Sequence, residues 1–597
     1  MKKRISALLV IGAVIFACGP ASAEPHKYAL SMFHCNIQYV IGGLYGFVPL
    51  PGNYPYWEIG PDETEDMIIR EGFEPILDLA LAHPNWTLTV ELQGMYIEAM
   101  AERHPDVLEK LKTLVDDGGV ELVSFHYSDQ LFIATPYDDW KHGLELNDQI
   151  FADHDLTLSG AVFCQEGQGA EGMATAMAEE GYSVMAWPVN LWEYQHGNFT
   201  SAPYYSFGDV KMVVASKDVN DPVNEVYTNW TFMNDGELMA TGDWDPYFPW
   251  FFHYRPESVA EYEATVEALE ADGYKISGIT DYVNDLIDLD IEPTEPPRLL
   301  DGTWQPDSTD GVSRWLGHRG LWGQDERDNH VRTLNNMAHR EILAAETAAE
   351  VAGLDRAEAL NEAWRQLVIA ETSDGSGINP YRGEVEFCVA SSAEALRLAR
   401  DVIDEAKATL GLDQVLINPA AQTVTSGTYT SPGAEMAEGP FKVQIKAKGR
   451  VVTQRWFKLQ NDPETWRLEI AYSVGTNDKS REFFVTFPGW GEEILTTTAL
   501  IDDQVISYPR ADFSFDHFYL PGPIGLIGLG HNWWVVKDMA TVHVAAYLTP
   551  QNRDIRFEDL TAPWSETITW VFYLRKGNEH QALQLADQVN VHPTLAR

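Results

Sequence analysis

The feature that most constrains the fold of this 597-residue chain is an alternation of short apolar runs and helical segments between residues 28 and 281. A typical helical segment spans 256–272, where apolar residues recur at helical spacing before Gly273. Seven or eight strands joined by helices over about 260 residues predict an α/β fold of the (β/α)7-type barrel class. The expected strands are 28–33, 87–92, 120–125, 160–163, 182–186, 210–215, 275–279 and one within 226–241.

A proline-rich stretch at 290–300 follows this region and is the expected domain boundary. Beyond it the pattern is mostly helical, and we expect a helix over 391–410 that opens with a capping box of Ser391 and Glu394. From residue 413 onward, short alternating runs separated by turns predict a C-terminal β-sandwich. The expected domains are a barrel at 24–290, a helical domain at 301–412 and a β-sandwich at 413–597.

The N-terminus predicts export. Basic residues at 2–4 precede an apolar run at 5–17, which is the pattern of a secretory signal peptide over 1–23. Cleavage after Ala23 would give a periplasmic or extracellular protein, and the alternative is a lipoprotein anchored through Cys18. No other stretch reaches the 18 or so apolar residues of a spanning helix, so we expect no integral membrane segment.

Charge and cysteine content exclude some function classes. A formal net charge of −49 argues against nucleic acid as a partner. Four cysteines, of which Cys18 is lost or lipidated, do not make a disulfide framework, and we expect buried free thiols. Zinc ligands could come from His34, Cys35, Cys164 or His126, but no ligand-spacing motif is present. The sequence therefore predicts no metal and no cofactor.

Glu166 is the strongest candidate for chemistry. It lies in Gln165-Glu-Gly-Gln168, directly after the expected strand 160–163. Residues just past the strands of a parallel barrel form its ligand-binding rim. Glycosidic cleavage needs two carboxyl groups that face one sugar bond, and Glu166 is placed to be the first.

The second carboxyl group is expected from the segment 230–247. Asp235 follows an apolar run, although Asn-Asp-Gly is also a turn signal. Asp243 is the other catalytic candidate, and Asp245 stands in an Asp-Pro turn ahead of an aromatic loop. The sequence leaves the identity of the acid/base open among Asp235, Asp243 and Asp245, with Asp235 and Asp243 as the leading candidates.

The candidates for substrate binding share a place at a strand end or an aromatic character suited to stacking on sugar faces. His34 and His126 end the first and third expected strands. The remaining candidates are Gln130, Trp187, Trp244, Asp245, Trp250, Trp315 and Asp374.

These motifs resemble glycoside hydrolase family 57. The resemblance rests on Gly119-Val-Glu-Leu-Val with His126-Tyr-Ser-Asp, then Phe163-Cys-Gln-Glu-Gly, then Asp235-Gly-Glu, with His34 as the first motif. It implies Glu166 as nucleophile, the Asp235 motif as source of the acid/base, and a retaining mechanism on α-linked sugars without an obligatory metal. The implied domain order, shared with family 38 mannosidases and polysaccharide deacetylases, is a barrel, a helical region and sometimes a β-sandwich.

The chain departs from the family pattern at three places. The first motif reads His34-Cys-Asn instead of His-Gln-Pro, no Leu-Pro precedes Glu166, and no Phe-Gly follows the Asp235 motif. We therefore expect an exported retaining glycoside hydrolase or transglycosylase with a carbohydrate as its partner. Two alternatives remain open: a metal-dependent carbohydrate deacetylase using His34, His126 and Asp129, and an inactive carbohydrate-binding protein.

Overall fold

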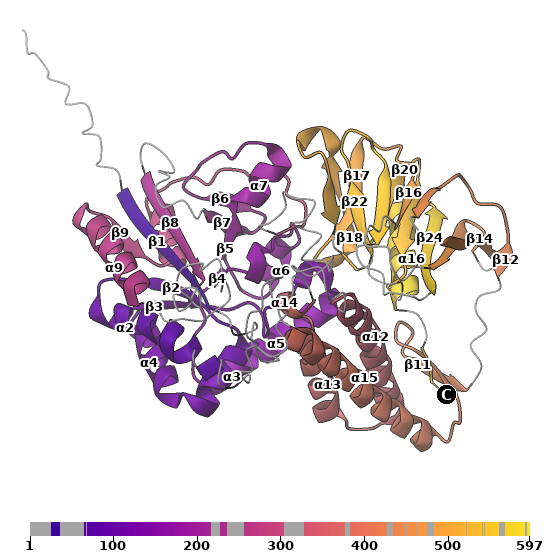
Figure 1. The fold of residues 1–597 in the computed structure, drawn as a ribbon, viewed down its shortest axis with the longest axis horizontal. Coiled ribbons are helices and arrows are strands. Elements are labelled where there is room, and N and C mark those ends of the chain that lie inside the picture. Colours follow the sequence, from indigo (N-terminus) through magenta and orange to yellow (C-terminus); the bar gives the residue numbers. More distant parts are fainter. Residues whose placement is uncertain are drawn as a thin grey trace, which may run out of the picture.

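The computed structural model contains a barrel, a helical region and a β region in chain order (Figure 1). The described residues are 26–35, 37, 62, 65–66, 68–215, 227–235, 256–303, 328–376, 382–426, 434–447, 450–460, 462–473, 483–520, 522–523, 525–539, 541, 544–559, 567–591 and 594–596. Among them, no helix is long and apolar enough to cross a membrane.

A parallel sheet forms one side of the barrel, with the order β3-β2-β1-β8 and with β9 paired to β1. Strands β1, β2 and β3 are buried on both faces along nearly their whole length because helices cover the outside, which explains their nearly continuous apolar sequences. The strands are β1 (His26–His34), β2 (Leu88–Glu91), β3 (Val120–Val123), β8 (Tyr227–Asp235) and β9 (Lys275–Ser277).

A second sheet, of order β4-β5-β7-β6, forms the other side. Its first three strands are parallel, and β6 pairs antiparallel with β7. The backbone N–H of Ser159 donates to the carbonyl of Leu122 at 2.8 Å, so the chain entering β4 lies against β3 and joins the two sheets. The strands are β4 (Ala161–Val162), β5 (Val184–Pro188), β6 (Tyr205–Phe207) and β7 (Val210–Ala215).

The barrel helices are amphipathic and bury one stripe against these sheets. In α4 (Pro105–Asp116) proline occupies the first turn, where its missing N–H is harmless, and Val107, Leu111 and Leu114 face the core. Each such burial contributes about 1.5–3 kcal/mol. The others are α2 (Glu74–Ala82), α3 (Gly94–Arg103), α5 (Tyr137–Asp153), α6 (Met173–Glu179), α7 (Val189–His196), α9 (Pro256–Ala271) and α10 (Ile279–Asp288), with short turns η2 (Ile68–Phe73), η3 (Phe132–Ala134) and η4 (Gln165–Gly167).

The helical region consists of α12 (Asp328–Ala352), α13 (Ala357–Ala370), α14 (Ser373–Ser376) and α15 (Arg382–Leu410) around an alanine- and leucine-rich core. The expected capping box at Ser391 is wrong, because α15 begins at Arg382 and Ser391 is a buried residue within it. The neighbouring Ser392 bonds back to the Cys388 carbonyl at 3.0 Å, so a hydroxyl is satisfied inside the helix without ending it.

The β region confirms the predicted C-terminal β architecture. An eight-stranded and a five-stranded sheet, antiparallel in their recorded pairings, share one core, which also includes barrel residues such as Leu191. The first contains β12 (Ala434–Met436), β14 (Arg450–Leu459), β15 (Thr465–Ser473), β24 (Thr567–Lys576), β21 (Trp533–Lys537), β20 (Ile527–Gly530), β17 (Glu493–Thr498) and β18 (Ile501–Pro509). The second contains β13 (Gln444–Ala447), β16 (Phe483–Phe487), β23 (Ile555–Asp559), β22 (Val544–Leu548) and β19 (Phe518–Leu520).

Three further strands form a small sheet, β11 (Thr423–Ser426), β10 (Val415–Asn418) and β25 (Thr594–Ala596), and η5 (Arg510–Asp512) and α16 (Glu579–Asn590) complete the region. Helix α16 does open with a capping box, between Asn578 and Gln581. The α/β class, with a barrel followed by a helical and a β region, is as predicted.

Candidate active site

Polar side chains gather where the parallel strands of the barrel end. The β-sheet register pairs His34 with Glu91 on one side and with Asp235 on the other, so the last residues of β2, β1 and β8 form one row. The carboxyl ends of parallel strands are where barrel enzymes bind ligands. This row is the starting point for the candidate site.

His34 is held by Glu91. Its Nδ1 lies 2.5 Å from Glu91 Oε2, and the Glu91 carboxylate is completely buried. The amide of Gln93 donates to the Cys35 carbonyl at 2.9 Å and so fixes the chain beside this pair. A carboxylate on one ring nitrogen sets the orientation of an imidazole and directs the other nitrogen to a ligand.

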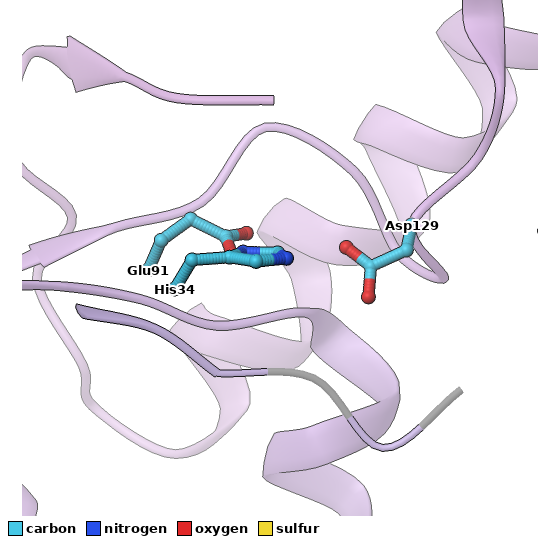
Figure 2. Close-up of side chains that lie close together, drawn as sticks. All are labelled: His34, Glu91 and Asp129. Atoms are coloured by element: carbon cyan, nitrogen blue, oxygen red, sulfur yellow. The ribbon is translucent and has the colours of Figure 1, made fainter. Parts of the chain in front are cut away.

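His126 and Asp129, on the segment after β3, lie against the same pair. Figure 2 shows the Asp129 carboxylate pointing toward the His34 ring from the far side of the site. His126 Nδ1 is 3.5 Å from Asp129 Oδ1, and both side chains are completely buried. Burial, and secondarily the charge of His34, lowers the pKa of His126 to about 3, so its imidazole is neutral at ordinary pH.

Gln130 and Gln168 connect the loops after β3 and β4. The Gln168 amide donates to the Gln130 carbonyl at 2.9 Å, and its oxygen accepts from the Ile133 backbone N–H at 3.3 Å. The Gln130 amide donates to Glu371 at 2.6 Å, and the Gln130 backbone bridges to Thr372. The helical region therefore reaches the rim and fixes Gln130, whose side chain is fully buried.

Glu371 belongs to a buried titratable cluster behind this rim. His339 Nδ1 lies 2.5 Å from Asp139 Oδ1, and the buried carboxyl groups of Asp139 and Glu371 lie close enough to influence one another. Burial raises the pKa of both carboxyl groups well above the ordinary value, with the proximity of Asp139 as the second cause at Glu371. The cluster lies where the barrel meets the helical region, since Asp139 belongs to α5 and Glu371 follows α13.

Glu166 stands at the turn that follows β4. Its backbone has φ 59° and ψ 20°, a left-handed conformation that is uncommon outside glycine, and the side chain is half-buried. The turn is closed by a hydrogen bond of 2.9 Å from the Gly167 N–H to the Cys164 carbonyl. A strained backbone at a strand end is often found at functional positions.

The structure places the other expected site residues in the core or at the ends of elements, or does not describe them. Trp187 is completely buried, and its ring packs on Gly169 and Phe207, so it is a core residue here and not an open stacking surface. Asp235 ends β8, and Asp374 lies in α14, with both side chains outside the described part of the structure. The candidates that lie outside the described residues altogether are Asp243, Trp244, Asp245, Trp250 and Trp315.

Sequence reasoning missed Glu91 and Glu371. Glu91 is the polar residue that ends the apolar run Leu88-Thr-Val-Glu, which is the same signal that singled out His34. Glu371 closes α13 far along the chain, and nothing in its sequence context indicates contact with Gln130. The three described cysteines, Cys35, Cys164 and Cys388, are buried thiols outside any disulfide, as expected.

Comparison with known proteins gives short sequence matches and a wider match in fold. No family model matches the chain. An alpha-amylase from Pyrococcus abyssi is 29% identical over 70 residues, and one from Pyrococcus horikoshii is 27% identical over 86 residues. These stretches are 12% and 14% of this chain and 11% and 14% of the two relatives.

An alpha-mannosidase from Enterococcus faecalis superposes with a TM-score of 0.60 at 10% identity, over 96% of this chain and 90% of its own. A glycosyl hydrolase family 38 protein from the same organism matches with a TM-score of 0.55 at 10% identity, over 96% and 89% of the two chains. The chain shares this fold. A family 57 branching enzyme from Thermococcus kodakaraensis matches 64% of this chain and 94% of its own at 13% identity, with a TM-score of 0.44. The two Enterococcus structures confirm the fold expected for the wider group that includes the family 38 mannosidases.

Proposed function

We propose that this chain is a retaining glycoside hydrolase or transglycosylase acting on α-linked oligo- or polysaccharides, with Glu166 as nucleophile and Asp235 or Asp243 as acid/base. The observation that carries the proposal is the placement of Glu166 on a left-handed turn directly after β4, in a barrel whose other strand ends carry His34, Glu91 and Asp235. The short matches to two alpha-amylases support the substrate class.

In the proposed reaction the Glu166 carboxylate attacks the anomeric carbon while the bond to the leaving oxygen breaks. The acid/base carboxyl group gives its proton to that oxygen and then removes a proton from water, which releases the sugar from Glu166 with retained configuration. When the hydroxyl of a second sugar replaces water, the same steps give transfer. A retaining mechanism requires the two carboxyl groups to lie about 5 Å apart.

His34 has a clear part in this scheme. The contact of Nδ1 with Glu91 fixes the ring, and the role proposed for His34 is to position a sugar hydroxyl. His126 is neutral and lies close to His34, so it adds no positive charge to the site. Both residues would position the substrate and would not take part in bond cleavage.

The N-terminal basic and apolar segments support export of the enzyme, to a periplasmic or extracellular compartment or as a lipoprotein through Cys18. The expected partner is carbohydrate. Membrane fractionation of the expressing cells, with a Cys18→Ser variant, distinguishes a lipoprotein from a protein that is simply exported. Lipid anchoring predicts that only the wild type stays with the membrane.

The function is tested by comparing Glu166→Gln with Glu179→Gln on a panel of α-linked glucans, mannans and their oligosaccharides. Glu179 is an exposed glutamate on α6, so its variant controls for the loss of one negative charge. We expect the Glu166 variant to lose several orders of magnitude in kcat, as loss of a nucleophile does elsewhere, and the control to keep wild-type turnover. Equal activity in all three proteins would refute the assignment.

A further inference from the structure

We propose that an aromatic surface on the β region binds a neutral α-linked polysaccharide. The aromatic surface consists of four rings from four separate segments: Phe441 precedes β13, Trp466 lies in β15, Trp490 follows β16 and Trp533 begins β21. The choice of an α-linked sugar rests on the proposed function, whereas the surface belongs to the β region and not to the barrel that carries Glu166.

The four rings are in contact with one another. The Phe441 ring centroid is 5.3 Å from that of Trp490 and 5.3 Å from that of Trp533, with interplanar angles of 87° and 88°. The Trp466 ring centroid lies 5.4 Å from that of Trp533. Edge-to-face contacts of this kind stabilise aromatic groups and fix their orientation. The aromatic surface is therefore one connected group and not a scatter of single exposed residues.

The backbone of Trp490 is held firmly. Its N–H donates a hydrogen bond of 2.7 Å to the carbonyl of Leu529. Gly530 has φ 87°, and a Cβ there would lie 2.7 Å from the backbone nitrogen of Gly491, so glycine lets the two segments approach closely. A binding group that is fixed in advance loses little conformational entropy when a ligand arrives. Trp490 is thus a pre-organised anchor.

The turn beside Trp490 adds hydrogen-bonding groups. His531 and Asn532 both have positive φ, as the two central residues of a type I′ hairpin turn do, and the Gly577 N–H donates to the Asn532 carbonyl at 2.8 Å. His531 is exposed, and its ring centroid lies 5.5 Å from that of Trp490. An imidazole can donate hydrogen bonds to hydroxyl groups and accept hydrogen bonds from them. A flat ring beside such a group matches a sugar, which presents C–H groups and hydroxyls together.

The size of the aromatic surface argues against a protein partner. Trp490 is 37% exposed, and the other three rings are less exposed. At about 250 Å² for a fully exposed side chain, the four expose at most about 370 Å² together. A stable protein interface needs about 800 Å² from each partner. Apolar patches of about 300–600 Å² on monomers are nevertheless often functional, so a smaller ligand is the better fit.

Charge narrows the choice of ligand further. The formal net charge of −49 makes a second copy of this chain, an anionic membrane and an acidic polysaccharide repel the protein. A neutral polysaccharide meets no such repulsion. Its sugar rings can lie on tryptophan faces and exclude water from them, which is favourable whatever the net charge of the protein.

Binding is measured on the full chain carrying Glu166→Gln, so that the polymer is not consumed, with amylopectin and an α-mannan as probes in affinity electrophoresis. We expect at least one of the two polymers to bind. Adding Trp490→Ala should raise its dissociation constant by at least about 10-fold, because a central tryptophan often supplies much of the binding energy of an interface. The control Leu81→Ala removes an apolar side chain that is 49% exposed on α2 of the barrel, and binding should be unchanged.

Three results would overturn the proposal. The first is that neither polymer binds, and the second is that Trp490→Ala binds as tightly as its parent. The third is a dimer in sedimentation velocity that Trp490→Ala converts to a monomer, which would assign the aromatic surface to a second copy of the chain.

Should Trp490→Ala not fold, oxidative footprinting of the parent chain decides, with the products mapped by peptide mass spectrometry. The bound polymer should slow the oxidation of Trp490 several-fold and leave that of Met337, an exposed residue on α12, unchanged. Equal oxidation of Trp490 with and without polymer overturns the proposal.

The failure of this proposal and the failure of the proposed function are distinguishable. With Glu166 intact, Trp490→Ala should keep the wild-type kcat on short oligosaccharides and raise KM on the polymer only, because the barrel is unchanged. A chain that binds the polymer through Trp490 but turns over no sugar would refute the proposed function and keep the binding surface. Turnover of oligosaccharides without polymer binding would do the reverse.

Discussion

Replacing Glu166 by glycine should remove activity and yet leave the protein more stable than replacing it by alanine. At φ 59° and ψ 20° a residue with a Cβ pays about 1–2 kcal/mol in the left-handed region, which glycine avoids. Glycine loses about 0.5–1 kcal/mol through its more flexible unfolded chain. The net expectation is that Glu166→Gly is about 0.5–1 kcal/mol more stable than Glu166→Ala.

Scanning calorimetry of the barrel transition measures this difference. About 2–4 °C per kcal/mol is expected for a domain of this size, so the glycine variant should melt about 1–4 °C above the alanine variant. As a control, Ala178→Gly inside α6 should lower the melting temperature, because glycine weakens a helix. If Glu166→Ala melted above Glu166→Gly, residue 166 would not have a left-handed backbone. That result would refute the argument that the candidate nucleophile stands on a strained turn.

Two further predictions concern the framework of the site. Because folding raises the pKa of Glu371, the folded chain binds more protons than the unfolded chain above about pH 4. The free energy of unfolding therefore falls as pH rises from about 4 through the folded-state pKa of Glu371. The decrease is at most about 1.4 kcal/mol per pH unit for one such proton. Glu371→Gln keeps an acceptor for the Gln130 amide and removes the titrating group, so urea unfolding between pH 5 and 9 should show a shallower decline of stability with pH. An unchanged slope would contradict the raised pKa of Glu371. In Gly172→Ala the new Cβ would lie 2.2 Å from the Ala499 carbonyl oxygen, and we expect a loss of about 1–3 kcal/mol in thermal unfolding. The control Gly522→Ala, with nothing within 4 Å of the new atom, should be nearly neutral, and equal melting of the two variants would refute the close contact between barrel and β region.

Much of the fold could be predicted from the sequence because buried parallel strands leave continuous apolar runs. All eight expected strands are present within a few residues of their predicted bounds, and the polar residues at their ends locate the rim. The sequence does not predict which strands lie next to one another in the sheet, since that depends on the strand order. The pairing of β1 with both β2 and β8 brings Glu91 and Asp235 to His34, and no local pattern encodes that order.

Burial was also hard to predict from local sequence. Trp187 ends an apolar strand beside polar loops, which resembles a sugar-stacking position, but Gly169 leaves room for the ring to pack in the core that the barrel shares with the β region. The expected cap at Ser391 failed because a serine followed by glutamate three residues later also occurs within long helices, where the residues upstream decide. The contact between Gln130 and Glu371 joins residues 241 apart, beyond the reach of periodicity.

The most direct measurement of the central claim is covalent trapping. The protein is incubated with activated fluoro-glycosides of α-glucose, α-galactose and α-mannose, and any adduct is mapped by peptide mass spectrometry. The account predicts one sugar attached to the peptide that contains Glu166, and no adduct on Glu166→Gln. An adduct on a different carboxylate, or turnover of the same sugars by Glu166→Gln at the wild-type rate, would contradict it.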